Sequence, residues 1–246
     1  MPSRNIKGLL EYDGTDFHGF QIQPEGFRTV QGEITRALTE ILNHPVKTIG
    51  ASRTDAGVHA LGQVVSFETS AIRTLDELKK GVNSKSPGDW RFLELNEVSM
   101  DFHPRYNAKS KTYIYLIDRL DSVLRRRMSW GITEKLNTDE MQKGVDLFRG
   151  EHDFKSFTLS SAHEGESTIR RMDELKVDDL DDLVIISITG SGFLYQMARR
   201  IVGVIVKLGK GEFGIADLTD LIDNPRFDSS GTAAPARGLI LKEIHY

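Results

Sequence analysis

Two charged residues lie close together in residues 50–62, Gly-Ala-Ser-Arg-Thr-Asp-Ala-Gly-Val-His-Ala-Leu-Gly. Arg53 and Asp55 are separated by one residue and by no bulky side chain. The three glycines of the segment permit tight turns and close approach of a second backbone. Charged side chains on an ordered loop between two strands are a common setting for a catalytic site. The alternative interpretation is an Asx-turn with a surface ion pair.

A second pair of charged residues lies in residues 190–203, Gly-Ser-Gly-Phe-Leu-Tyr-Gln-Met-Ala-Arg-Arg-Ile-Val-Gly. The apolar spacing from residue 193 onward predicts a helix that is buried on most sides. Arg199 and Arg200 fall within that pattern, and a buried guanidinium needs a carboxylate partner. One of the two could therefore face Asp55. The alternative is that both side chains extend along the helix to solvent.

Two tyrosines alternate with other residues in residues 109–115, Lys-Ser-Lys-Thr-Tyr-Ile-Tyr. Because side chains alternate between the two sides of a strand, Tyr113 and Tyr115 should face the same side. An exposed aromatic ring on a strand can stack on an RNA base. The alternative is that both rings pack in the core.

Several familiar motifs are absent or out of context. Residues 209–214 match GxGxxG, but they follow a predicted helix, whereas a dinucleotide-binding loop follows a strand. A helix end and a turn explain them better. The sequence has no Walker A, HExxH or GxSxG motif, no cysteine, and no metal-like spacing of its seven histidines. His152-Asp153 is better interpreted as a cap or turn. The motifs that ATP-, NAD- or zinc-dependent chemistry requires are therefore all missing.

Composition limits the protein class without deciding it. The 246 residues are 39% hydrophobic and 28% charged, which suits a folded chain of one or two domains. No apolar run is long enough to span a membrane or act as a signal peptide, so a soluble cytoplasmic protein is expected. The formal net charge is −4, but residues 173–182 alone carry −5 and the remainder +1. This acidic run is predicted to be a solvated turn, and nucleic-acid binding stays open.

The periodicity of apolar residues predicts a mixed fold. Helices are expected at 30–42, with Thr29 as N-cap, and at 74–82, 138–149, 193–208 and 215–223. Strands are expected at 6–12, 46–50, 62–68, 91–98, 111–118, 170–178, 183–189 and 238–245. A similar order of strands and helices occurs in both halves, so the fold class is α+β with two related lobes, 1–105 and 106–246. The lack of a low-complexity linker indicates a shared core.

Several blocks of the sequence, taken in order, resemble the tRNA pseudouridine synthase A family. The most specific is Arg53–Ala60, RTDAGVHA, and the others are individually weaker. The blocks are Tyr12–Gln21, Thr29–Gly32, Ser52–Ala60, Asp101–His103, Lys111–Tyr113, Gly150–Phe154 and Phe193–Gly203. Ala198 stands where the family usually has Val, which should not affect the chemistry. The stretch Asn83–Pro87 is more polar than is usual in the family.

The resemblance implies a reaction and a fold. Members of this family isomerise uridine to pseudouridine at positions 38, 39 and 40 of the tRNA anticodon stem-loop. They cleave the N1–C1′ glycosidic bond, rotate the uracil and rejoin it through C5, without cofactor or metal. The implied architecture is two ferredoxin-like lobes that form a continuous antiparallel sheet, with helices on one side and a central cleft. The resemblance also implies a homodimer, with tRNA contacting both subunits.

The resemblance carries over to five residues. Asp55 would be the catalytic carboxylate, acting as a nucleophile at C1′ or C6 or as a base at C2′. Arg199 is expected to keep Asp55 ionised and oriented. Tyr113 would stack on the uracil and could take part in proton transfer. Arg53 would lie beside the extruded nucleotide, and His59 would be a further substrate-binding residue.

Three other functions remain open at this stage. A related synthase could act on another RNA with the same catalytic residues. A catalytically inactive tRNA-binding or tRNA-folding chaperone could share the fold. A glycosidic-bond hydrolase would also use a carboxylate, but usually with a paired acid or a metal, and it would release free uracil.

Overall fold

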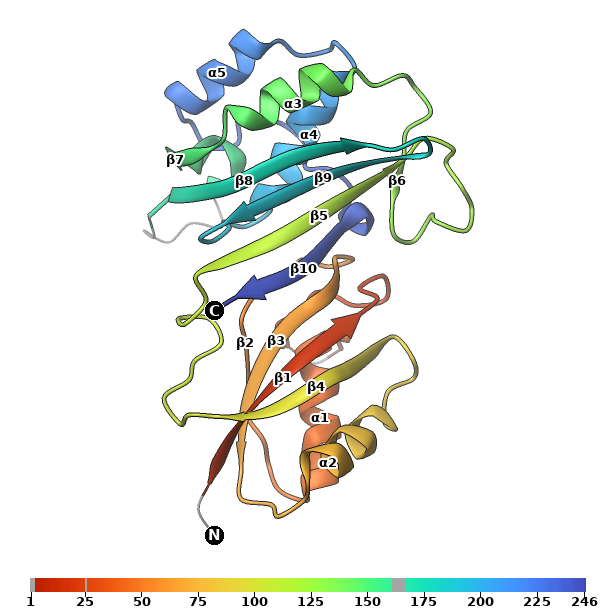
Figure 1. Ribbon diagram of the computed structural model, residues 1–246, viewed down its shortest axis with the longest axis vertical. Coiled ribbons are helices and arrows are strands. Elements are labelled where there is room, and N and C mark those ends of the chain that lie inside the picture. The colour runs from red at the N-terminus through yellow and green to blue at the C-terminus, as the bar shows by residue number, and fades with distance from the viewer. Residues whose placement is uncertain (1–2, 25, 161–166) are drawn as a thin grey trace. The chain divides into compact units, whose positions relative to one another are not determined.

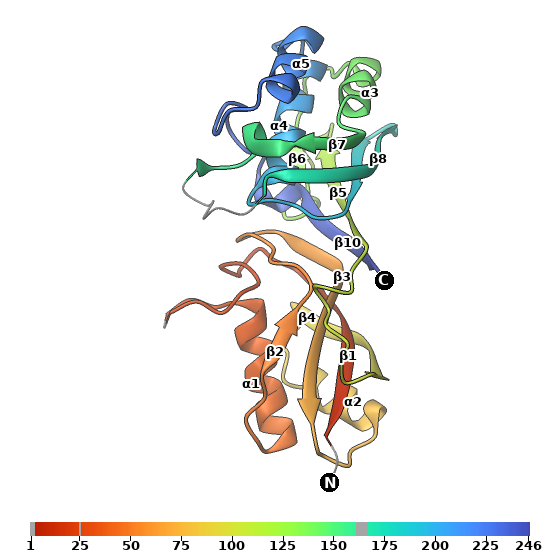
Figure 2. The same ribbon diagram turned by 90° about the vertical axis from the view of Figure 1, so that its left-hand side faces the viewer.

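In the computed structural model, which describes residues 3–24, 26–160 and 167–246, the chain forms two units (Figures 1 and 2). Unit 1 comprises Met1–Lys109 together with Ile240–Tyr246, and unit 2 comprises Ser110–Leu239. This division differs from the predicted 1–105 and 106–246 at the C-terminus, where the last seven residues join the first unit. Both units combine strands and helices, so the predicted α+β class is confirmed.

The sheet of unit 1 has the strand order β4-β1-β3-β10, and β2 also pairs with β3. Its strands are β1 (Arg4–Tyr12), β2 (Thr48–Gly50), β3 (His59–Thr69), β4 (Trp90–Val98) and β10 (Leu239–His245). β1 is antiparallel to β3 and β4, and β2 is antiparallel to β3. β10 runs parallel to β3, with Ile240 opposite His59, so the pairing in this sheet is not antiparallel throughout.

Two helices cover one face of this sheet. α1 (Val30–Leu42) begins at Thr29, whose side chain accepts a hydrogen bond from the Gly32 amide, as the N-cap prediction requires. α2 (Leu75–Asn83) begins with a capping box formed by Thr74 and Glu77. α1 lies against the sheet, and α2 contacts both α1 and β4 (Figure 1).

The sheet of unit 2 has the order β5-β9-β8-β7, and the short β6 pairs with β5 in parallel. Its strands are β5 (Ser110–Asp118), β6 (Trp130–Gly131), β7 (Gly150–Asp153), β8 (Ile169–Asp179) and β9 (Leu183–Gly190). The other three pairings are antiparallel. The sequence predicted the β8–β9 hairpin but not β6 or β7.

The helices of unit 2 are packed on one another as well as on the sheet. They are α3 (Thr138–Asp146), α4 (Met197–Gly209), α5 (Ile215–Asp223) and two short 3₁₀ turns, η1 (Phe154–Phe157) and η3 (Ala236–Gly238). α3 contacts α4 and β8, and α5 contacts α3 and η1. α4 is buried along most of its length, as its apolar pattern predicted.

Three predictions for unit 2 need correction. The chain does not enter α4 at residue 193, because Gln196 adopts a left-handed conformation (φ 57°) immediately before the helix. α3 ends at Asp146 because residues 147–149 continue in tighter i to i+3 turns. Most of the acidic run 173–182 lies on strand β8 rather than in the turn, which is only residues 180–182.

Two other predictions for this unit are confirmed. Residues 209–214 form the end of α4 and the turn into α5, with Gly211 at φ +74°. Asp153 caps η1 by accepting a hydrogen bond from the Lys155 amide.

Candidate active site

Residues 51–58 form the loop between β2 and β3, and they carry both Arg53 and Asp55. The Val58 amide donates to the Asp55 carbonyl oxygen at 3.2 Å, which closes a tight turn. Gly57 lies at φ +77°, a conformation that glycine adopts without steric cost. The turn leaves Asp55 half-buried and Arg53 exposed.

The side chain of Gln63, which is fully buried on β3, holds the start of this loop. Its Oε1 accepts from the Ser52 amide at 3.2 Å, and its Nε2 donates to the Ser52 carbonyl oxygen at 2.8 Å. Oε1 also accepts from the Val64 amide at 3.1 Å, and Nε2 lies 3.4 Å from the Tyr12 hydroxyl. One buried side-chain amide therefore provides a hydrogen-bond partner for both backbone groups of Ser52, as buried polar groups require.

The segment that follows β1 packs directly against the middle of the loop. The Tyr12 hydroxyl lies 2.7 Å from the Thr54 hydroxyl, and the Phe20 amide donates to the Thr54 carbonyl oxygen at 3.0 Å. A Cβ atom at Gly14 would lie 2.0 Å from the Val58 carbonyl oxygen, so only glycine allows this approach. These contacts fix the backbone on both sides of Asp55, as a preorganised site requires.

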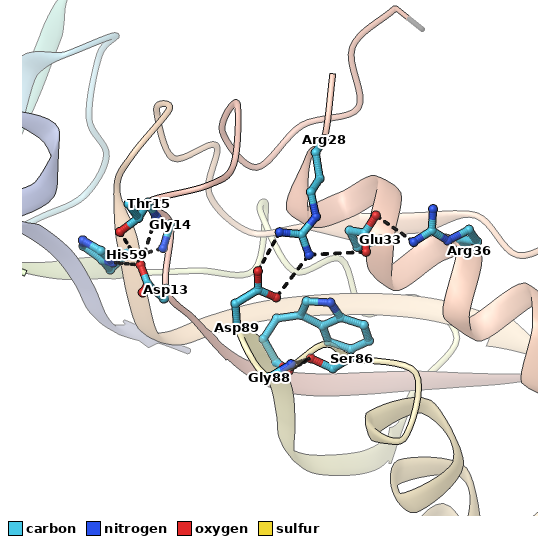
Figure 3. Close-up of polar contacts among 11 residues, drawn as sticks. Asp13, Gly14, Thr15, Arg28, Glu33, Arg36, His59, Ser86, Gly88 and Asp89 are labelled. Atoms are coloured by element: carbon cyan, nitrogen blue, oxygen red, sulfur yellow. Dashed lines mark hydrogen bonds and ion pairs between the residues drawn. The ribbon is translucent and has the colours of Figure 1, made fainter. Parts of the chain in front are cut away.

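His59, the first residue of β3, is buried and ties the loop to the turn after β1. The Gly14 amide donates to His59 Nδ1 at 3.0 Å, and Asp13 Oδ1 lies 3.2 Å from the same nitrogen (Figure 3). Asp13 Oδ1 also accepts from the amide and the hydroxyl of Thr15, at 3.0 and 2.6 Å. His59 thus helps to hold the turn against the loop. Its predicted contact with substrate stays a prediction.

A second polar network, also drawn in Figure 3, involves Arg28, at the end of the segment that runs from β1 to α1. Arg28 donates to both carboxylate oxygens of Asp89, at 2.6 and 3.2 Å, and its Nη2 lies 3.5 Å from Glu33. The Arg28 guanidinium lies 4.3 Å from the centre of the buried Phe17 ring. The Phe17 carbonyl oxygen in turn accepts from the Gly57 amide at 3.3 Å, so this network reaches the loop 51–58.

In unit 2, the two predicted tyrosines share one face of β5, and both are buried. The Tyr115 hydroxyl donates to the Pro235 carbonyl oxygen at 2.8 Å, which makes Tyr115 a core residue. The Tyr113 ring meets Phe193 edge to face, with the ring centres 4.9 Å apart. The expectation of an exposed stacking ring is therefore wrong for Tyr115. Tyr113 is held by a neighbouring ring rather than displayed in solvent.

Arg199, in the first turn of α4, is oriented by residues 234–235. Its Nε donates to the Ala234 carbonyl oxygen at 2.8 Å, and the Ala234 amide donates back to the Arg199 carbonyl oxygen at 3.0 Å.

Burial raises the pKa of the Tyr115 hydroxyl well above its ordinary value, despite the opposing positive charges of Arg199 and Arg237. Tyr115 therefore stays protonated and keeps its hydrogen bond to Pro235 at physiological pH.

Arg200, the other arginine of the pair, has a different environment. It is 7% exposed, and its Nη1 donates to the Gly231 carbonyl oxygen at 2.8 Å. Its Nε is buried without a hydrogen-bond partner among the described residues. The alternative that both arginines extend to solvent is therefore wrong for Arg200, and Arg199 is the more accessible of the two.

The five predicted site residues fall into two groups. Arg53, Asp55 and His59 lie together in unit 1, on the loop and the first residue of β3, and Tyr113 and Arg199 lie in unit 2. Sequence reasoning missed two positioning groups, the Gln63 side chain and the Ala234 carbonyl. A signal for Gln63 was present, because a polar side chain within an apolar strand must find a partner when it is buried.

Within residues 3–24, 26–160 and 167–246, no three His, Asp or Glu side chains are grouped so that they could hold a metal ion. In the same ranges, no helix is long and apolar enough to cross a membrane.

Comparison with known proteins identifies the family. A family model described as tRNA pseudouridine synthase matches residues 9–107 and 145–246. Proteins named tRNA pseudouridine synthase A are similar along the full chain. The one from Acetivibrio thermocellus is 40% identical over 99% of this chain and 100% of its own. The one from Exiguobacterium sp. is 37% identical over 99% and 98%, respectively. This chain therefore belongs to the tRNA pseudouridine synthase family.

Solved structures resemble the chain more distantly. An archaeal box H/ACA sRNP Nop10-Cbf5 complex matches 82% of this chain and 44% of the other, at 12% identity and a TM-score of 0.38.

Proposed function

We propose that this protein converts uridine to pseudouridine at positions 38, 39 and 40 of the tRNA anticodon stem-loop. The observation that carries the proposal is the rigid presentation of Asp55 by the loop 51–58, which Gln63 and Tyr12 hold in place. Family membership supplies the substrate class, since the full-length relatives are named tRNA pseudouridine synthase A.

The reaction is an isomerisation, so it requires proton movement but no net change in composition. The N1–C1′ bond breaks, the uracil turns, and a C1′–C5 bond forms. The hydrogen on C5 leaves as a proton, and N1 ends with a proton. Because no electrons are exchanged with another molecule, the chemistry needs no redox cofactor, and we propose that the side chains suffice.

Asp55 is the proposed catalytic residue. Its carboxylate can form a covalent bond to C1′ or C6 as a nucleophile, or remove the C2′ proton as a base. In each case it must act from a fixed position, because a displacement of about 1 Å can cost about 100-fold in rate. The hydrogen bonds on both sides of the loop support this requirement.

Arg199 and Tyr113 are the proposed partners from unit 2. Arg199 would keep Asp55 ionised and oriented, and the Ala234 carbonyl already fixes one edge of its guanidinium. Tyr113 would stack on the target uracil and move a proton through its hydroxyl. The edge of Phe193 fixes the plane of the Tyr113 ring, which supports a stacking role.

The target base must leave the RNA stem before it can react, which costs a few kcal/mol. Arg53 is exposed on the same loop as Asp55, and we propose that it lies beside the extruded nucleotide. His59 would contribute to substrate binding mainly through the turn at Asp13–Thr15 that it holds. The remaining cost would be offset by phosphate contacts from basic side chains.

We further propose a homodimer in which one tRNA contacts both subunits, and a cytoplasmic location. The dimer rests on the family resemblance, and sedimentation of the free protein and of its tRNA complex would test it. The location follows from the proposed substrate.

The central test uses unmodified tRNA labelled with tritium at uridine C5, because the reaction expels that hydrogen. The protein should release tritium to water, and sequencing of the product should place pseudouridine at 38–40. Asp55→Asn should abolish release but keep tRNA binding. Asn is nearly isosteric with Asp, so folding should be preserved, and an unchanged melting temperature is the control.

The other functions give different results. Tritium release with pseudouridine at other positions or in another RNA would indicate a synthase with a different target. Binding without release, by the wild type as well as the variant, would favour a tRNA chaperone. Free uracil in the medium would identify a hydrolase. Full activity of Asp55→Asn would refute the assignment of the catalytic residue.

A further inference from the structure

The segment between β4 and β5 displays an aromatic ring that the proposed catalytic reaction does not use. Tyr106 is 77% exposed, although tyrosine rings usually bury much of their surface. Its inner face stacks on His103, with ring centres 4.2 Å apart and planes inclined by 28°. The outer face of the stacked pair is therefore presented to solvent as a flat surface.

The backbone beneath this pair is tightly hydrogen-bonded. His103 Nδ1 accepts from the amides of both Arg105 and Tyr106, at 3.2 Å each. The His103 amide donates to the Asn107 side chain at 2.6 Å, and the Asn107 amide donates back to the His103 carbonyl oxygen at 3.0 Å. The stacked rings are thus set before any ligand arrives, which lowers the entropy cost of binding.

The segment is also anchored to the rest of unit 1. The Tyr246 hydroxyl donates to the Pro104 carbonyl oxygen at 2.9 Å, and the Phe102 and Tyr246 rings lie 5.3 Å apart. Lys7 Nζ lies 4.2 Å from the centre of the Tyr246 ring. Asn5 Nδ2 donates to the Phe102 carbonyl oxygen at 3.1 Å. The display of Tyr106 is therefore a property of a rigid element and not of a mobile arm.

Charge around the ring favours a nucleic acid as its partner. The segment between β4 and β5, residues 99–109, contains Arg105 and Lys109 and a single acidic residue, Asp101, which lies four positions before Arg105. Arg105 is exposed, and its guanidinium lies 5.9 Å from the centre of the Tyr106 ring. A flat aromatic face with a neighbouring cation can stack on a base and contact the adjoining phosphate.

We propose that Tyr106 and His103 form a stacking platform for an unpaired nucleotide of the bound tRNA, and that Arg105 contacts the phosphate next to it. This site would lie outside the reaction centre and would position the RNA rather than act on the target uridine. The inference rests on the proposed function for its ligand, but its test reads binding and does not depend on catalysis.

The experiment measures the affinity of fluorescently labelled, unmodified tRNA over a series of salt concentrations. Stacking on one base contributes about 1–3 kcal/mol, so Tyr106→Ala should weaken binding by about 5- to 150-fold. Tyr106→Phe keeps the ring and should bind within about twofold of the wild type, the range of an ordinary surface substitution. Arg105→Gln should reduce the slope of log affinity against log salt by about 0.7–0.9, the loss of one phosphate contact.

The matched control is Ile72→Ala, which removes a side chain of similar exposure, 75%, from the same unit. It should leave both affinity and salt slope unchanged. In the tritium assay, Tyr106→Ala should raise KM and leave kcat unchanged. Tyr106→Ala binding as tightly as the wild type, or Tyr106→Phe binding as weakly as Tyr106→Ala, would overturn the inference. A wild-type protein that binds tRNA but releases no tritium would contradict only the proposed function.

Discussion

Gln63→Leu tests whether the position of the loop 51–58 depends on a single buried side-chain amide. Leucine is close to glutamine in size, but it can form neither hydrogen bond to Ser52. Removing one hydrogen-bond partner of a buried polar group costs about 1–3 kcal/mol, so the loss of both Gln63 bonds to Ser52 costs about 2–6 kcal/mol. For a protein of this size, that corresponds to a fall of about 4–24 °C in melting temperature.

Gln63→Leu should also slow catalysis, because the loop that carries Asp55 loses one of its attachments. If residues 51–58 detach locally, water satisfies Ser52, and the loss of global stability is smaller than this range. Asp55 then spends less time in its reactive position, and we expect the single-turnover rate of tritium release to fall by about 10- to 100-fold. A large fall in melting temperature indicates loss of global stability. A small fall with a slower rate indicates local detachment of residues 51–58.

A half-buried glutamine in unit 2 that also bonds a backbone amide provides the control. Gln142 accepts a hydrogen bond from the Val177 amide at 2.8 Å, far along the chain from the loop. Gln142→Leu should lower the melting temperature and leave the rate of tritium release unchanged. A normal rate for Gln63→Leu, at any melting temperature, would refute the argument that Gln63 positions Asp55.

Three further predictions concern unit 2. Tyr113→Phe should keep tRNA affinity but slow product formation in the tritium assay, whereas Tyr113→Leu should lose both; undiminished rates for the two variants would remove Tyr113 from the site. Arg199→Lys should slow single-turnover tritium release by about 100-fold, since a lysine cannot replace a planar guanidinium. Arg200→Leu should keep the wild-type rate, because the Arg200 side chain donates to the Gly231 carbonyl oxygen instead. A slow Arg200→Leu variant and a fully active Arg199→Lys variant would instead assign the role of Asp55 partner to Arg200. Burial raises the pKa of Asp118, but hydrogen bonds from Arg125 and two backbone amides outweigh it and hold that pKa below its ordinary value. The resulting stability is present above about pH 4 and is lost as the pH falls further, so melting temperatures should drop more steeply below about pH 4 for the wild type than for Asp118→Asn.

Elements with strong local signals could be predicted from the sequence. α1 was placed correctly because Thr29 can cap a helix whose apolar residues recur at helical spacing. α5 and the β8–β9 hairpin were also placed well. The start of α4 was misplaced because residues 193–196 continue its apolar pattern, and periodicity does not reveal that Gln196 has a positive φ.

Interactions between distant parts of the chain were harder to predict. The pair Arg53 and Asp55 stood out because charged residues are unusual in a loop of small ones. The pairing of Gln63 with Ser52 depends on the register of β2 and β3, which the sequence alone does not give. The choice between Arg199 and Arg200 depends on where residues 231–234 return against α4, and no local pattern encodes that.

The return of Ile240–Tyr246 to unit 1 has a consequence for protein synthesis. These residues supply the strand beside His59 and Ala60, and the His245 carbonyl oxygen accepts from the Lys109 amide at 2.8 Å. The ribosome makes all of Ser110–Leu239 before this strand, so a nascent chain already contains Asp55 while residues 59–60 of β3 still lack their β10 neighbour. The pairing of β10 with β3 is therefore one of the last steps in the folding of unit 1. Until then, this short stretch of strand edge stays open to pairing with another chain, and the arrival of β10 closes it.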